Sequence, residues 1–242
     1  MIFNLRSPQK KMKKIVGILG GMGPEATADF FLKIIKLTPA KKDEEHLHII
    51  IDNDPQIPDR TEAILKGGKS PLPALQKTAQ NLERAGADFI VIPCNTAHYF
   101  FDEIEKMVNI PLLHMMREVS KEIKEGFPEV KRVGLLSTSA TARMRLYQNE
   151  LEKERIMVIS PKEKEQEEIM KAIKLIKGSE YLSSKDILKK IGGKLFLRGA
   201  ELLVLGCTEI PLILKQNDFS HPVIDAGYVL AKAAVKKALD IS

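Results

Sequence analysis

The chain has 242 residues and a formal net charge of +6 at pH 7, but most of that excess comes from five basic residues before the first acidic residue, Glu25: Arg6, Lys10, Lys11, Lys13 and Lys14. The rest of the chain is close to neutral, which argues against a basic groove and hence against a nucleic-acid partner. No stretch is apolar for long enough to span a membrane, so we expect a soluble, cytoplasmic protein with no membrane partner.

The N-terminal residues 1–11 contain too short an apolar stretch for a signal peptide. Met12 stands just before the first predicted strand. We therefore expect either that Met12 is the true start of the chain or that residues 1–11 form a disordered tail.

Short apolar runs rich in β-branched residues are typical of buried parallel strands. In chain order they lie at 15–19, 47–51, 89–92, 111–113, 133–136, 156–159, 202–205 and 223–224. Amphipathic stretches with helical periodicity alternate with them, at 25–37, 72–85, 115–124, 142–153, 165–176 and 187–197. This alternation predicts an α/β fold in which parallel sheets are flanked by helices.

A glycine-rich segment, Gly20-Gly21-Met22-Gly23-Pro24, follows the first predicted strand. At a strand-to-helix junction, glycine lets the backbone approach a ligand, and unpaired N–H groups can bind a carboxylate or a phosphate. The spacing is not GxGxxG, so it does not predict a dinucleotide site. We count Met22 among the candidate substrate-binding residues.

A loop that contains two prolines follows the second predicted strand and ends at Arg60. A guanidinium held there can bind a carboxylate through two hydrogen bonds. The alternative is a surface ion pair with Asp59 or Glu62.

The only two cysteines lie in matching segments. Each segment has a Gly-Ala-acid turn, an apolar run, and then Cys94 or Cys207 followed by small polar residues. The offset that separates the two cysteines aligns both segments without a gap, and Val16-Gly17 similarly matches Val133-Gly134. We therefore expect two copies of one half that pack about a pseudo-two-fold axis, with the thiols facing each other across a cleft. Two opposed acid/base groups are what inversion of a carbon centre requires.

Each cysteine follows a predicted strand, at the sheet edge where open parallel sheets bind ligands. A disulfide is disfavoured in a cytoplasmic chain. A metal site built from Cys94, His98, His114 and Cys207 has no compact ligand motif to support it. A nucleophilic pair of Cys94 and His98 leaves the second cysteine unexplained.

Four motifs now stand together: GILGGMGPEAT at 17–27, PQIPDRT at 55–61, IPCNTAH at 92–98 and LGCTEIP at 205–211. In these motifs the chain resembles the aspartate/glutamate racemase family, in its aspartate racemase branch. The resemblance runs from about Lys13 to the C-terminus. The opening Asp-Ser-Gly-Val-Gly-Gly of glutamate racemases is not found here. After the last strand this chain has Asp225-Ala226-Gly227, where relatives often have Asp-Pro or Asp-Ser-Thr.

The resemblance implies two pseudo-symmetric α/β domains with the active site in the cleft between them. The first domain would comprise residues 1–109 and 221–242 and the second residues 110–220, because the chain of this family crosses between domains after each cysteine. It also implies a homodimer, a small amino-acid substrate, and neither pyridoxal phosphate nor a metal. Cys94 and Cys207 carry over as the catalytic acid and base. The residues that carry over to the substrate site are Asn95, Thr96, Ala97, Thr208, Glu209, Arg60 and Lys177.

We therefore predict cofactor-independent racemisation of aspartate. Glutamate or a broader range of amino acids is an alternative, because one methylene changes binding by only about 1 to 3 kcal/mol. A dicarboxylate cis-trans isomerase or a decarboxylase of the same fold is a second alternative. A catalytically silent carboxylate-binding protein is a third.

Overall fold

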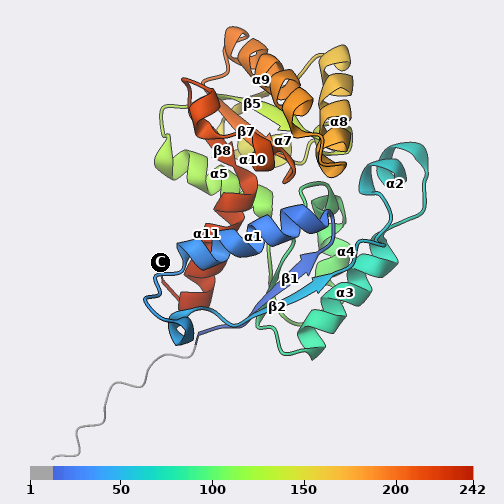
Figure 1. Cartoon of the computed structure of the whole chain (residues 1–242), viewed down its shortest axis with the longest axis vertical. Coiled ribbons are helices and arrows are strands. Elements are labelled where there is room, and N and C mark those ends of the chain that lie inside the picture. The colour runs from blue at the N-terminus through green and yellow to red at the C-terminus, as the bar shows by residue number, and fades with distance from the viewer. Residues whose placement is uncertain (1–12, 242) are drawn as a thin grey trace, which may run out of the picture.

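The computed structural model describes residues 13–241, so the predicted tail at 1–11 and the predicted start at Met12 lie outside the described residues. The chain forms two lobes, each built on a four-stranded parallel sheet flanked by helices (Figure 1). The strand orders are β2-β1-β3-β4 and β6-β5-β7-β8, so the second sheet repeats the order of the first. The predicted α/β class with two similar halves is confirmed.

The two sheets also share a register. The first contains β1 (Val16–Gly20), β2 (Ile49–Asn53), β3 (Phe89–Val91) and β4 (Leu112–Leu113); the second contains β5 (Arg132–Ser137), β6 (Met157–Ile159), β7 (Leu202–Gly206) and β8 (Val223–Asp225). Val16 lies opposite Phe89 between β1 and β3, and Val133 lies opposite Leu202 between β5 and β7. When the two halves are aligned by sequence, Val16 matches Val133 and Phe89 matches Leu202. The sequence repeat is therefore also a structural repeat.

The strand pairings differ from the predicted domain boundaries at two strands. Residues 110–220 were expected in the second domain, yet β4 pairs with β3 in the first sheet. Residues 221–242 were expected in the first domain, yet β8 pairs with β7 in the second sheet. The chain leaves each sheet only after its last strand, because that short strand extends the parallel ladder at the edge of its own sheet.

Three helices lie between the two sheets. They are α1 (Pro24–Leu37), α5 (Met115–Gly126) and α11 (Ala226–Leu239), and α11 packs against both α1 and α5 (Figure 1). The C-terminal helix therefore contacts the first lobe although the strand before it belongs to the second sheet. The remaining helices are α2 (Arg60–Lys66), α3 (Leu72–Arg84), α4 (Phe101–Glu105), α6 (Ser139–Arg143), α7 (Gln148–Leu151), α8 (Glu163–Lys177), α9 (Tyr181–Leu197) and α10 (Ile210–Ile213). None of the helices within residues 13–241 is long and apolar enough to cross a membrane.

Two of these features differ from the sequence prediction. The single helix expected at 142–153 is divided into α6 and α7, and Arg145 between them has a left-handed φ of 55°. Helices α2, α4, α10 and α11 were not among the predicted helices. Helix α11 is apolar on most of its surface because it is buried between the lobes, so it lacks the one-sided pattern of a surface helix.

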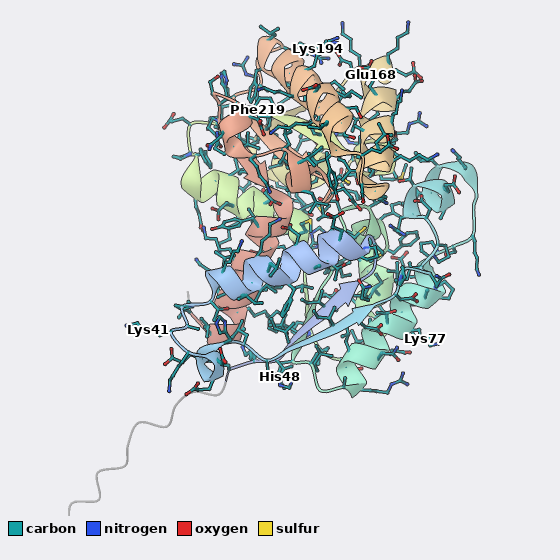
Figure 2. All side chains as sticks on the ribbon, viewed as in Figure 1. Lys41, His48, Lys77, Glu168, Lys194 and Phe219 are labelled. Carbon is teal, nitrogen blue, oxygen red and sulfur yellow. The ribbon has the colours of Figure 1, made fainter. Side chains whose placement is uncertain are left out.

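The core has three parts. One cluster fills the space between the two sheets and includes residues of α1, α5 and α11, and the other two lie on the outer faces under α3 with α4 and under α8 with α9. Alternate residues of each inner strand point to opposite faces of the sheet: Val16 and Ile18 of β1 belong to the shared cluster, whereas Leu19 belongs to an outer one. Side chains fill the interior in Figure 2, while charged residues such as Lys41, Lys77 and Glu168 lie outside.

The repeated Gly-Ala-acid turn has the same structural role in both halves. Gly86 and Gly199 have positive φ values of 96° and 94°, which residues with a side chain rarely adopt. The carboxylate of Asp88 accepts a hydrogen bond from the N–H of Ile15 at 2.6 Å, and Glu201 accepts one from Arg132 at 2.9 Å. Each turn therefore anchors the start of the first strand of its own lobe.

Asp225 connects the C-terminal segment to the first lobe. One carboxylate oxygen caps α11 by accepting from the N–H groups of Gly227 at 2.8 Å and Tyr228 at 3.1 Å. The other lies 2.7 Å from the Nζ of Lys33 on α1. The side-chain contacts of this segment are thus a helix cap and an ion pair between the C-terminal segment and the first lobe.

Candidate active site

The two thiols line one small cavity between the lobes. Cys94 follows β3 and Cys207 follows β7 directly, so both lie at the carboxyl edge of their sheet. Both are free and buried, with 6% and 4% of their surface exposed. The residues that line this cavity are Met22, Asp59, Arg60, Thr61, Cys94, Asn95, Thr96, Thr138, Lys177, Cys207, Thr208 and Glu209.

Nearly all the site residues expected from the sequence lie in this lining. The exception is Ala97, which is fully buried in the outer core of the first lobe and lines neither this cavity nor the larger one beside it. The lining also contains Asp59, Thr61 and Thr138, which were not among the site residues expected from the sequence. The alignment of the two halves offered a signal for Thr138, because it matches Gly21 in the glycine-rich segment.

A second cavity of about 350 Å³ adjoins the first. It shares Met22, Asp59, Arg60, Lys177 and Glu209 with the small cavity. The rest of its lining is largely apolar and includes Pro55, Ile57, Ile176 and Leu212. The arrangement provides room for a group that extends from the thiols past the two cations.

Arg60 is held in place by the backbone of its own loop. It is the first residue of α2 and is only 8% exposed. Its Nη1 donates to the carbonyl oxygens of Ile57 at 3.2 Å and Pro58 at 3.1 Å. Asp59, the predicted surface partner, instead caps α2 by accepting from the N–H of Glu62 at 2.8 Å. The guanidinium is therefore fixed on one side and faces both cavities.

Glu209 links Cys207 to Lys177. The thiol of Cys207 donates to Oε2 of Glu209 at 2.9 Å, and the Nζ of Lys177 lies 3.7 Å from Oε1. Burial and the charge of Glu209 raise the pKa of Cys207 well above its usual range, although Lys177 opposes this. Burial by itself lowers the pKa of Lys177, but the favourable charge interactions around the ammonium, of which that with Glu209 is the largest, together shift the pKa upward. Cys207 is therefore a neutral thiol beside a charged lysine.

The loop after each cysteine is bound by the opposite half of the chain. Thr96 shares hydrogen bonds with Thr138 at 2.8 Å and Thr141 at 3.1 Å, at the start of α6. In the other direction, Thr208 donates to the carbonyl oxygen of Pro93 at 3.1 Å. These contacts fix the spacing of the two thiol-bearing loops.

His98 is occupied by backbone groups on both ring nitrogens. The N–H of Met115 donates to Nε2 at 3.1 Å, so the proton is on Nδ1, which donates to the carbonyl oxygen of Cys94 at 2.9 Å. Burial and the nearby His114 lower the pKa of His98 to about 3. To act as a base for the Cys94 thiol or as a metal ligand, His98 would need a ring nitrogen without a hydrogen bond. Both of its ring nitrogens are bonded to backbone groups. Within residues 13–241 no group of three or more His, Cys, Asp or Glu side chains has a metal-binding arrangement.

We predict that His98→Ala destabilises the protein by about 2 to 5 kcal/mol, because it leaves two buried backbone groups without partners. A His98 that stays neutral stabilises the fold above pH 6.5, and this contribution is lost as the pH falls toward 3. Urea unfolding at pH 7 and pH 4.5 measures both effects. The exposed His48→Ala serves as the control. Equal stability of the wild type and His98→Ala at pH 7 would contradict the prediction.

Comparison with known proteins gives a consistent set of relatives. Residues 19–234 match the family described as Asp/Glu/hydantoin racemase. The chain is 30% identical over 238 residues to the broad specificity amino-acid racemase RacX of Bacillus subtilis strain 168, an alignment that covers 93% of this chain and 98% of that protein.

Solved structures agree. Picrophilus torridus aspartate racemase superimposes with a TM-score of 0.85 at 35% identity, over 93% of this chain and 94% of that one. An aspartate racemase homologue from Pyrococcus horikoshii OT3 has a TM-score of 0.73 at 30% identity, over 94% and 99%. Glutamate racemase from Francisella tularensis shares the fold alone, with a TM-score of 0.66 at 19% identity, over 91% and 79%.

Proposed function

Because the chain belongs to the Asp/Glu/hydantoin racemase family, we propose that this amino-acid racemase interconverts L- and D-aspartate through a two-base mechanism with Cys94 and Cys207 as the bases. The observation that carries the proposal is the shared cavity, in which two buried thiols from equivalent strands lie together with Arg60 and Lys177. Opposed acid/base groups can serve the two faces of a planar carbanion.

The proposed reaction begins with one cysteine as thiolate. In one direction the Cys94 thiolate takes the proton from Cα, and the Cys207 thiol gives its proton to the opposite face. Cys207 then holds the negative charge, beside the ammonium of Lys177. In the reverse direction the two residues exchange roles. The raised pKa of Cys207 supports its part as the proton donor.

The carbanion needs electrostatic stabilisation, which Arg60 and Lys177 are proposed to supply together with backbone N–H groups of the cysteine loops. Aspartate has two carboxylates, and the cavity has two cations in its lining. Since the two thiols supply both proton transfers, we propose that pyridoxal phosphate takes no part in the reaction.

A broader substrate range is the second candidate. The larger cavity, with Pro55, Ile57, Ile176 and Leu212 in its lining, supports it because those side chains can contact an apolar substrate group. The relative from Bacillus subtilis carries the description of a broad-specificity enzyme.

Both candidates can be tested together. Purified protein without added cofactor is incubated in deuterium oxide with L-aspartate, L-glutamate or L-leucine, followed by chiral chromatography and proton NMR. D-aspartate with deuterium at Cα is the expected product. Comparable turnover of leucine would favour the broad-specificity candidate. Failure of all three substrates to exchange the Cα proton would overturn the proposed function.

We predict that Glu209→Gln lowers the pH at which Cys207 becomes a thiolate by at least about one unit. The charge of Glu209 raises the pKa of Cys207, so its removal favours the thiolate. Because only the thiolate is nucleophilic, the rate of Cys207 alkylation by iodoacetamide against pH reports the change. Glu25→Gln, a change in the lining of the larger cavity, is the control. An unchanged alkylation profile in Glu209→Gln would contradict the prediction.

A further inference from the structure

Tyr147 makes a buried hydrogen bond across the two lobes. It lies between α6 and α7 of the second lobe and is fully buried. Its hydroxyl donates to Oδ1 of Asn95, the residue after Cys94, at 2.5 Å. Burial, with the negative charge of Asp225, raises the pKa of Tyr147 well above its usual range. The hydroxyl therefore keeps the proton that it donates.

This bond determines which way the Asn95 amide points. An amide has an acceptor oxygen on one side and a donor nitrogen on the other. The oxygen of Asn95 is taken by Tyr147, and Nδ2 is buried with no hydrogen-bond partner among the described residues. Asn95 is 2% exposed and lines the small cavity. A buried donor without a partner is costly, so this one is suited to an acceptor on a ligand.

The hydroxyl is specific to the second half of the chain. The alignment that pairs Val16 with Val133 also pairs Phe30 with Tyr147. Phe30 is 1% exposed, and both rings belong to the core cluster between the sheets. Both halves therefore place an aromatic ring at this position in the core, and only the ring of the second half carries a hydroxyl.

We propose that Tyr147 is a positioning residue that holds the Asn95 amide with its N–H groups toward a carboxylate of the substrate. The inference rests on the proposed function. Without the hydroxyl, the amide can turn and present its oxygen, which repels a carboxylate. Tyr147 does not touch the substrate and acts only through Asn95.

The experiment is a double-mutant cycle of Tyr147→Phe and Asn95→Ala, with kinetics on aspartate and aspartate binding by calorimetry. Tyr147→Phe is expected to raise KM and Kd by about 3- to 10-fold, the value of one hydrogen bond, with a smaller change in kcat. In the Asn95→Ala background, the same change is expected to have no further effect, because Tyr147 acts through that amide. The control, Tyr99→Phe, removes a half-exposed hydroxyl from the same loop and leaves both constants unchanged.

A second variant keeps the inference testable if Tyr147→Phe folds poorly. Asn95→Asp retains an acceptor for the tyrosine but replaces the N–H groups with an oxygen, and should weaken aspartate binding more than Tyr147→Phe does. The inference would be overturned if Tyr147→Phe and Asn95→Ala had additive effects on aspartate binding. It would also be overturned if either Tyr147→Phe or Asn95→Asp bound aspartate as tightly as the wild type. If the wild type binds aspartate but does not racemise it, the proposed function is wrong. The effect of Tyr147→Phe on aspartate binding would still test the inference about Tyr147. A wild type that does neither overturns both.

Discussion

Alanine in place of either Cys94 or Cys207 is expected to lower aspartate racemisation by at least about 10³-fold, since each thiol carries one of the two proton transfers. The two variants should differ in what remains. In deuterium oxide, each one-thiol variant should exchange the Cα proton of only one enantiomer, the one whose proton faces the remaining thiol. Proton NMR of separate L- and D-aspartate samples measures this exchange.

The exchange pattern would also assign each thiol to an enantiomer. Alanine fits both sites, because both side chains are small and buried. Circular dichroism and aspartate binding would verify that each variant is folded. Cys94→Ser and Cys207→Ser keep the volume but replace the thiol with a much weaker acid, so they should be as inactive as the alanine variants. Two-way turnover near the wild-type rate in any single variant would exclude the two-base mechanism.

Arg60→Ala is expected to raise KM for aspartate by about 10- to 100-fold, because a buried charge-assisted hydrogen bond contributes about 1.5 to 3 kcal/mol. Arg60→Lys should recover only part of this loss, since an ammonium keeps the charge but cannot form the two parallel bonds of a guanidinium. Steady-state kinetics of the three proteins provides the comparison.

The matched control is Lys66→Ala, which removes an exposed cation from the other end of the same helix. Its KM should equal that of the wild type. A KM in Arg60→Ala that is also unchanged would mean that Arg60 does not bind the substrate. An equal rise for a monocarboxylic amino acid would indicate that Arg60 binds the α-carboxylate rather than the side chain.

Local patterns were sufficient for much of the fold. The repeated Gly-Ala-acid turns predicted two equivalent halves, and the equal registers of β1 with β3 and of β5 with β7 confirm it. The family resemblance is confirmed by the match over residues 19–234. The domain boundaries were harder to predict, because a strand of two or three residues such as β4 or β8 has no signal for which sheet it joins.

The site shows the same division between local and long-range information. Sequence motifs brought attention to Arg60 and the residues after both cysteines, and the family resemblance added Lys177. Arg60, Lys177, Asn95, Thr96, Thr208 and Glu209 line the cavity. The resemblance also carried Ala97 over to the substrate site, but its side chain lies in the core. Tyr147 has no motif of its own, because its importance comes from a single contact with a residue far along the chain.

The sequence by itself determined the α/β class, the two-fold repeat and the position of both thiols at strand ends. These follow from periodicity and spacing, which depend on near neighbours in the chain. Only the tertiary structure decided that the Cys207 thiol donates to Glu209, that both His98 nitrogens bond to the backbone, and that the Tyr147 hydroxyl donates to Asn95. Each of these depends on burial and on atoms brought together by packing, and a one-dimensional pattern carries neither the distance between such atoms nor their exclusion from water.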